Sequence, residues 1–155
     1  MIFETKEDIE APMDHVFGVI SDFGRFERQA LRRGAEVRRL DQLSVPGVGM
    51  VWDIVFQMRG KQRDIKVELI EFDRPNRLVL ESKSPGLAGD MVAELVALSR
   101  GRTRLSLKVE LKPQTLSARL LVQSLKLAKG NLNKRFMVRV AEFAKDTEDQ
   151  FKRMA

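Results

Sequence analysis

Hydrophobic positions change their spacing twice along the chain, and these changes predict the order of the elements. Residues 2–9 contain β-prone side chains and stop at Ala11-Pro12, so we expect a first strand there. A helix is predicted from Pro12, which suits a first helical turn because its missing N–H needs no partner. The apolar face of this helix recurs at short helical spacings: Val16, Phe17, Ile20 and Phe23. Gly24 interrupts it near its end, and a second short helix is predicted over residues 26–33, stopped by Gly34.

From residue 35 to residue 112 the hydrophobic positions alternate with polar ones, which predicts strands. The clearest strand spans residues 49–59, and one of its faces is entirely apolar: Met50, Trp52, Ile54, Phe56 and Met58. Turn signals at 59–61, 74–76, 84–86 and 100–102 separate the successive strands. The apolar phase shifts to Ile70 and Phe72, which predicts a β-bulge or a bend. Consecutive hairpins of this kind make an antiparallel sheet.

The last quarter of the chain returns to helical spacing. Between Leu116 and Phe151 there is no proline and one glycine, and Thr115 is a suitable N-cap. We expect one long amphipathic helix, bent at Gly130-Asn131. Its apolar stripe consists of Leu121, Leu125, Ala128, Leu132, Phe136, Val140, Phe143 and Phe151. The predicted fold is α+β: residues 1–155 form a single domain in which a curved antiparallel sheet of about seven strands wraps around this helix.

Composition narrows the chemistry. The chain has 155 residues, a net charge of +6, one histidine, no tyrosine and no cysteine. Disulfide scaffolds, cysteine-based metal sites and thiol catalysis are therefore excluded. The charged N-terminus is unlike a signal peptide, and no apolar run approaches the ~20 residues that span a bilayer. We expect a soluble, cytoplasmic protein without metal or cofactor.

At this point the sequence resembles the helix-grip (SRPBCC) superfamily, which includes START lipid-transfer domains, the birch-pollen-allergen type and polyketide cyclases or dehydrases. The residues that carry the resemblance are Ile9-Glu10-Ala11-Pro12, Val16-Phe17, Ser21-Asp22-Phe23, Gly47-Val48-Gly49 before Trp52, and the terminal helix. The resemblance is nearest to the polyketide cyclase/dehydrase-like branch. It implies a deep cavity between the sheet and the long helix that holds a hydrophobic molecule.

Periodicity by itself leaves open whether the apolar strand face is a packed core or a pocket wall. With the resemblance, the predicted ligand-binding residues are Trp52, Ile54, Phe56, Leu78, Leu80, Met91, Leu105, Leu107, Leu121 and Leu125. Access is expected through residues 84–89 and 47–49 or past the short helices. Gly47 and Gly49 precede a strand rather than a helix, so they do not form a phosphate-binding loop.

Polar candidates for the cavity are few. Glu7 is a candidate if residues 3, 5, 7 and 9 share the inner face, Arg63 is in phase with Ile65 and Val67, and Glu94 lies on a strand either face of which can be covered. Buried charge is rare, so solvent is the ordinary location for each of the three. His15, the sole imidazole, is predicted to be a solvated surface residue. No catalytic set is predicted.

Basic residues gather in two stretches. The first is Arg25, Arg28, Arg32 and Arg33; the second is Lys126, Lys129, Lys134, Arg135 and Arg139. Such residues usually form a solvated helix face. Their functional interpretation is attraction to an anionic membrane surface. No aromatic platform accompanies them, so no specific nucleic-acid binding is expected.

The sequence favours binding or transport of a hydrophobic small molecule: a lipid, an isoprenoid or a polyketide-like compound. A cyclase or dehydratase acting without metal or nucleophile is one alternative. The other is a protein-interaction module resembling a chaperone co-factor, which predicts a filled core and an exposed apolar patch.

Overall fold

The computed structural model describes residues 1–155 as one antiparallel sheet and four helices. The strands are β1 (Ile2–Ile9), β2 (Glu36–Arg39), β3 (Val51–Met58), β4 (Lys61–Asp73), β5 (Arg77–Ser84), β6 (Leu87–Ser99) and β7 (Arg102–Pro113). The helices are α1 (Met13–Ile20), α2 (Phe23–Arg32), α3 (Leu116–Leu127) and α4 (Lys129–Met154). The seven strands lie in the order β1-β7-β6-β5-β4-β3-β2, so β1 and β2 are the edges. The predicted α+β class is confirmed.

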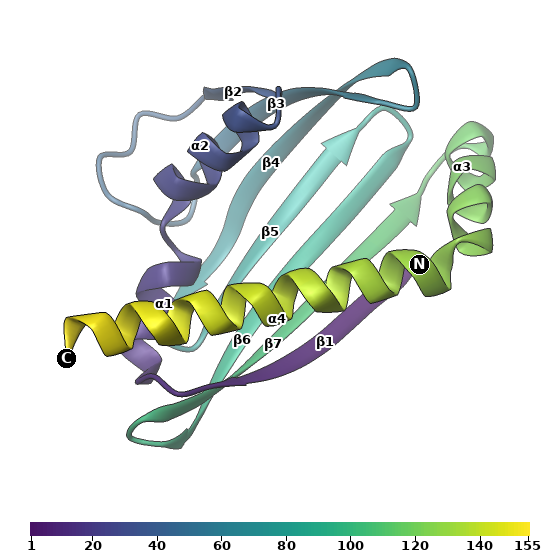
Figure 1. The fold of residues 1–155 in the computed structure, drawn as a ribbon. Helices are drawn as coiled ribbons and strands as arrows, with labels where there is room; N and C mark the ends of the chain where they lie inside the picture. Colours follow the sequence, from purple (N-terminus) through teal and green to yellow (C-terminus); the bar gives the residue numbers. More distant parts are fainter.

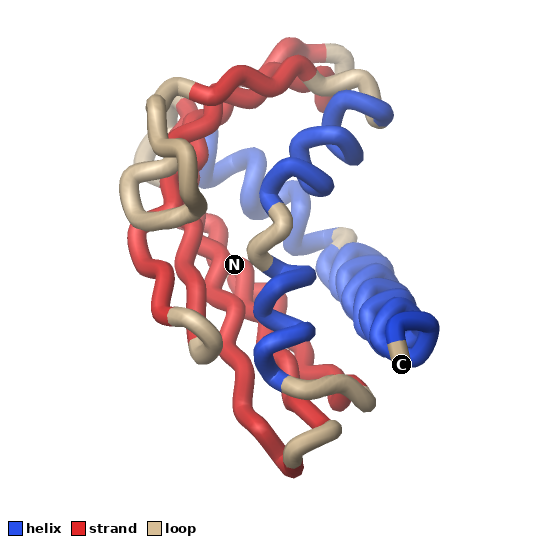
Figure 2. Tube along the Cα trace, turned by 90° about the vertical axis from the view of Figure 1, so that its left-hand side faces the viewer, coloured by secondary structure: helices blue, strands red, loops and turns tan.

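The sheet is open and strongly curved, and α4 lies along its concave side (Figures 1 and 2). Contacts with β1 hold α4 in place, among them the rings of Phe3 and Phe136, whose centroids are 6.0 Å apart. The tube view shows α1 and α2 on the same side of the sheet as α4. A sheet that curves around a long helix is the predicted arrangement.

The packed core lies where α1 meets the concave face. Phe17, Leu69 and Leu78 are almost fully buried there, and the ring of Phe17 lies 5.3 Å from that of Phe72. The predicted bulge is confirmed: the β4–β5 register shifts between Leu69 and Glu71, which explains the change of apolar phase in β4. None of the helices combines the length and the apolar composition needed to cross a bilayer.

The predicted boundary between the first two helices is wrong. Helix α1 ends at Ile20, and Phe23 belongs to α2 rather than to the first helix. The Asp22 side chain accepts a hydrogen bond from the Arg25 backbone N–H at 3.2 Å, as an N-cap residue does. This cap starts α2 three residues earlier than predicted, with Gly24 in its first turn. The short edge strand β2 was not singled out because four residues show too little alternation.

The prediction that one continuous helix spans residues 116–151 is also wrong, because the structure has two helices there. Thr115 caps a helix as predicted, accepting from the Ala118 N–H at 3.2 Å, but Ala128 leaves helical geometry and separates α3 from α4. The break therefore precedes the expected bend at Gly130-Asn131. A continuous helix over residues 116–151 would be ~54 Å long. The longest strands, of 13 residues, extend only about 43 Å. The break lets α3 stand at the end of the sheet while α4 crosses the concave face (Figure 1).

Candidate functional site

An apolar cavity of about 450 Å³ lies between the concave face of the sheet, α2 and the middle of α4. Of the 19 residues that line it, 17 are hydrophobic. Small-molecule sites in proteins typically occupy about 300–1,000 Å³ and are lined mainly by apolar side chains. The concave face is therefore packed only in part, and the remaining space is large enough for a small ligand.

The structure brings most of the predicted ligand-binding residues to this cavity. They are Trp52, Ile54, Leu78, Leu80, Met91, Leu105 and Leu107. Each lies on the inward-facing side of a strand, which is the side that alternation selects. Their contact with a ligand stays a prediction.

Three of the predicted residues do not line the cavity. Phe56 lies farther along β3, paired with Arg63 of β4 close to the β3–β4 turn. Leu121 and Leu125 belong to α3, which the break at Ala128 directs away from the concave face. The prediction assumed a continuous helix, and with that assumption it placed them over the sheet.

The cavity wall contributed by α2 was not predicted from the sequence. Phe23, Phe26 and Ala30 line the cavity from this helix, and Phe26 stacks on Phe143 of α4 with ring centroids 6.3 Å apart. Phe136, Val140 and Phe143 supply the opposite wall. These α4 residues belong to the apolar stripe of the terminal helix, so a signal for them was present in the sequence.

The opening of the cavity lies between α2 and α4. Two of the residues that line the cavity, Phe26 of α2 and Arg139 of α4, are also exposed to solvent, so the cavity meets solvent beside these helices. Entry past the short helices, one of the predicted routes, is compatible with this position and stays a prediction. No residue of segments 47–49 or 84–89 lines the cavity.

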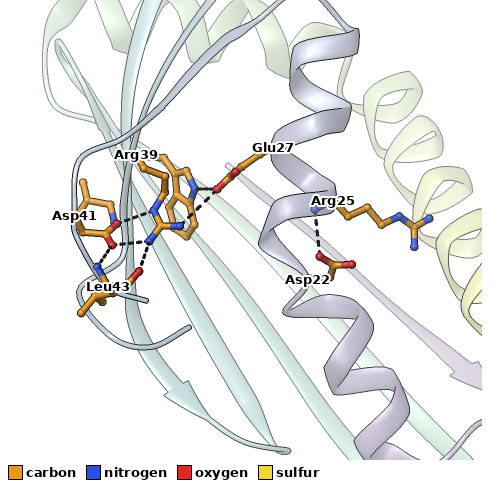
Figure 3. A network of polar contacts seen from close by, with 8 residues as sticks. Asp22, Arg25, Glu27, Arg39, Asp41 and Leu43 are labelled. Atoms are coloured by element: carbon orange, nitrogen blue, oxygen red, sulfur yellow. Dashed lines mark hydrogen bonds and ion pairs between the residues drawn. The ribbon is translucent and has the colours of Figure 1, made fainter. Parts of the chain in front are cut away.

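Glu27 and Arg139 are the two charged residues among those that line the cavity. The Trp52 indole Nε1–H donates to Oε1 of Glu27 at 2.7 Å, and the Arg39 guanidinium lies 3.8 Å from the same oxygen (Figure 3). The Arg39 guanidinium also lies 5.5 Å from the centroid of the Trp52 ring, within the range of a cation–π contact. Trp52 is thus held in the cavity wall from two directions.

This network extends to the loop between β2 and β3 through Asp41. Arg39 donates to both Asp41 oxygens, at 2.8 and 2.5 Å, and Asp41 also accepts the backbone N–H groups of Val51 and Leu43 (Figure 3). The Arg39 hydrogen bonds, followed by those backbone donors, hold the pKa of the Asp41 carboxyl far below its usual range. Asp41 therefore fixes the loop to the start of β3, next to Trp52.

Arg139 differs from this network because it makes no ion pair and no hydrogen bond to another side chain. Its guanidinium, which has five donors, is therefore available at the opening. The cavity combines apolar walls with one engaged carboxylate and one free cation.

The predicted polar candidates do not line the cavity, so that expectation needs correction. Glu94 is exposed and bound to Arg77. Glu7 is half-buried on edge strand β1, and Arg63 is half-buried near the β3–β4 turn, with its Nε buried and without a partner. Strand phase correctly placed Glu7 and Arg63 on the inward side of the sheet, but the cavity occupies only the middle of that side. Glu94 follows Ala93, which lines the cavity, so its side chain lies on the opposite face.

His15 is not the solvated surface residue that was expected. It is half-buried, its ring lies 5.1 Å from that of Phe151, and its Nε2 is buried without a hydrogen-bond partner. The C-terminal part of α4 covers it. A sequence pattern restricted to α1 could not reveal that contact, which joins residues far apart in the chain.

No protein-family model matches the sequence, and no curated protein matches it either. Solved structures do match. The Zhui aromatase/cyclase from Streptomyces sp. R1128 superposes with a TM-score of 0.63 at 15% identity, covering 94% of this chain and 93% of that one. Norcoclaurine synthase from Thalictrum flavum, in complex with dopamine and hydroxybenzaldehyde, gives 0.60 at 16%, covering 86% and 83%. Ara h 8.0201 gives 0.60 at 13%, covering 94% and 98%.

These identities are low, and what they establish is the fold. The chain adopts the helix-grip fold of the superfamily that its sequence resembles. Proteins with this fold include synthases and cyclases, so function has to be argued from the cavity itself.

Proposed function

We propose that this protein binds or transports a hydrophobic small molecule, such as a lipid, an isoprenoid or a polyketide-like compound, in the cavity between the sheet and α4. The observation that carries the proposal is a cavity of about 450 Å³ in which 17 of 19 lining residues are hydrophobic. Each Å² of apolar ligand surface removed from water there contributes roughly 25 cal/mol. Such walls favour an apolar ligand over a polar one because few groups can replace its lost hydration.

The charges at the opening refine the ligand class. Glu27 is already engaged by Trp52 and Arg39, whereas Arg139 is free. A ligand with an apolar body and one anionic or hydrogen-bond-accepting group near α4 would satisfy both the walls and Arg139. We propose an anionic membrane surface as the source of the ligand and the cytoplasm as the location of the protein.

A cyclase or dehydratase is the second candidate. The observation in its favour is the Glu27 carboxylate on an otherwise apolar wall, because acid–base catalysis requires a titratable group beside the substrate. With Glu7, Arg63 and Glu94 away from the cavity, this activity would depend on Glu27 and Arg139. The interaction-module hypothesis predicted a filled core, and the cavity argues against it.

The test combines extraction with a cavity-filling variant. Denatured, solvent-extracted protein is analysed by mass spectrometry for a stoichiometric small molecule. The ligand-depleted protein is then titrated with 1-anilinonaphthalene-8-sulfonate, a probe with an apolar body and one anionic group. Ala93 is buried and lines the cavity from β6, so Ala93→Phe places a ring in the empty space. We expect this variant to bind the probe at least about tenfold more weakly, a difference of ~1.4 kcal/mol.

The matched control is Ala88→Phe. Ala88 lies on the same strand, five positions away and therefore on the opposite face of the sheet, and it does not line the cavity. Its probe affinity should equal that of the wild type, and thermal unfolding would verify that both variants fold. Equal probe binding by Ala93→Phe and wild type would contradict the proposal. Turnover of an extracted compound, abolished by Glu27→Gln, would favour the enzyme instead.

A further inference from the structure

The outward face of α3 carries large hydrophobic side chains that the rest of the protein leaves uncovered. Leu116, Leu120 and Leu127 are 74%, 59% and 92% exposed. With a helical rotation of about 100° per residue, these three positions fall within a strip only ~40° wide. We call this set the outer stripe. The buried residues of the helix, Ala118 and Val122, lie on the opposite side, so α3 is apolar on two faces and only one of them is used for packing.

The position of α3 keeps the outer stripe away from the cavity. The helix stands at one end of the sheet, beyond the end of α4 (Figure 1). The Arg59 Nη1–H donates to Ser124 Oγ at 3.0 Å, which ties the middle of α3 to the β3–β4 turn. The outer stripe therefore forms a convex surface at an extremity of the molecule.

The charge of the protein is concentrated around the same region. Residues 111–141 contain seven Lys or Arg residues and no Asp or Glu, whereas the whole chain has a net charge of +6. The remainder of the chain is therefore close to neutral. Lys112 is paired with Asp90 at 2.6 Å. The other six make no ion pair: Arg119, Lys126, Lys129, Lys134, Arg135 and Arg139.

Apolar and charged groups are arranged on α3 as on a helix that lies in a membrane interface. Arg119 and Lys126 flank one side of the outer stripe, and Lys129 follows its last leucine by two residues. In such helices the apolar face enters the boundary between headgroups and acyl chains, while flanking cations meet anionic headgroups. Cations close to an anionic leaflet are attracted by its negative surface potential.

We propose that α3 is the element that docks this protein on an anionic lipid bilayer, with the outer stripe inserted and the neighbouring cations Arg119, Lys126 and Lys129 on lipid phosphates. This inference rests on the membrane partner of the proposed function and names the surface that meets it. A second copy of the chain is a poorer occupant, because a two-fold interface through the stripe would bring the flanking cations of both copies together. An anionic bilayer is complementary to both the leucines and the charge.

The experiment is co-sedimentation with vesicles of phosphatidylcholine alone and of phosphatidylcholine mixed with phosphatidylserine. Wild-type protein should sediment with the mixed vesicles, and added salt should weaken the binding. The double variant Leu120→Gln/Leu127→Gln should bind at least about tenfold more weakly, because two side chains that would be buried among the acyl chains become polar. The matched control Val96→Gln/Leu98→Gln removes two exposed apolar side chains from β6 and should bind like the wild type.

Two further variants separate docking from ligand binding. Lys126→Glu/Lys129→Glu should lose the preference for phosphatidylserine. Ala93→Phe, with a blocked cavity, should still bind vesicles, so that failure of the ligand proposal is distinguishable from failure of this one.

Three results would overturn the docking role of α3. The first is equal binding of the wild type to neutral and anionic vesicles, or no binding to either. The second is wild-type binding by the leucine double variant or loss of binding in Ala93→Phe. The third is a wild-type dimer that dissociates in the leucine double variant, measured by sedimentation equilibrium, because the outer stripe would then be an interface between copies.

Discussion

The cavity and the outer stripe of α3 are both apolar surfaces, but they differ in curvature and in the state of the charges beside them. The cavity is concave, and both the sheet and the helices α2 and α4 form its walls. The outer stripe is convex and belongs to one helix. A concave apolar surface can enclose a molecule of its own size. A convex strip encloses nothing, so it loses water only against a broad surface.

The charged groups differ in the same way. Around Trp52 the carboxylates of Glu27 and Asp41 share the guanidinium of Arg39, and the loop backbone completes the set. Groups that the cavity walls shield from water need partners because unpaired polar groups are costly once water is excluded. Arg139 lines the same cavity but is exposed, so it can stay unpaired. The cations near the outer stripe lie in water and carry no such cost, so they remain free for a partner. The paired charges therefore contribute to stability, and the free charges are available for recognition.

The largest expected effect is on the free energy of unfolding, which should fall for a substitution in the cavity wall and not for one in the outer stripe. Leu105 is buried and lines the cavity, so Leu105→Ala should lower the free energy of unfolding by about 2–3 kcal/mol. Leu120 of the outer stripe is exposed, and Leu120→Ala should change it by no more than ~0.5 kcal/mol. Urea unfolding followed by circular dichroism measures both. Equal losses would mean that the outer stripe packs against something within the protein.

A smaller effect on the free energy of unfolding is expected when the paired charge of the cavity, Glu27, is compared with the free charge, Arg139. Glu27→Leu leaves the Trp52 indole N–H without its acceptor and should lower the free energy of unfolding by about 1 kcal/mol. Glu27→Gln keeps an acceptor oxygen and should lose less. Arg139→Leu breaks no ion pair and no side-chain hydrogen bond within the protein, so its stability should equal that of the wild type within ~0.5 kcal/mol.

Arg139→Leu, which should leave stability unchanged, should nevertheless weaken ligand binding. We expect Arg139→Leu to weaken binding of 1-anilinonaphthalene-8-sulfonate several-fold, because the sulfonate loses a cation at the opening. Titration by fluorescence measures the affinity. An unchanged affinity, together with a loss of stability, would show that Arg139 is a structural residue rather than a recognition residue.

The smallest effect concerns pH. Arg39 and the backbone donors lower the pKa of Asp41 below its ordinary value of 3.8, so folding favours the ionised carboxylate. That contribution is fully present above pH 3.8 and is lost as the pH falls through the lower pKa of the folded state. The difference in melting temperature between wild type and Asp41→Asn should therefore be constant from neutral pH down to about 4 and shrink below it.

The control for this pH effect is a charge on α3. Lys126 has no carboxylate partner, so the difference between wild type and Lys126→Gln should show no comparable change in acid. A wild-type advantage over Asp41→Asn that persisted unchanged into strong acid would contradict the role assigned to the Arg39 pair.

Much of the fold was predictable because alternation is a local property of a strand. The β3 residues Trp52 and Ile54 could be assigned to the inward side from their neighbours in sequence, and the bulge in β4 was visible as a change of phase. The break at Ala128 was not predictable in this way. Ala128 leaves helical geometry inside a segment of continuous helical spacing, and neither a proline nor a glycine stands at that position to indicate it.

The residues of the candidate site also fall into a group that local spacing predicted and a group that it did not. Strand residues such as Leu105 and Leu107 were predicted because their faces repeat every second residue. Phe26 and Glu27 were missed because α2 reaches the cavity only through the turn at Ser21 and Asp22, and helical spacing does not say which neighbour a face meets. The partners of Glu27 are far away in the chain, at positions 39 and 52.

By itself, the amino-acid sequence determined the helical or extended class of most segments, the inward side of the clearly alternating strands and the excess of positive charge, since these depend on neighbours within a few residues. The tertiary structure alone decided that α3 separates from α4, that Glu27 is engaged while Arg139 is free, and that the outer stripe remains uncovered. Those features arise from contacts between segments that are distant in the chain. Local spacing permits several arrangements of these segments, and side-chain packing and the exclusion of water decide which one forms.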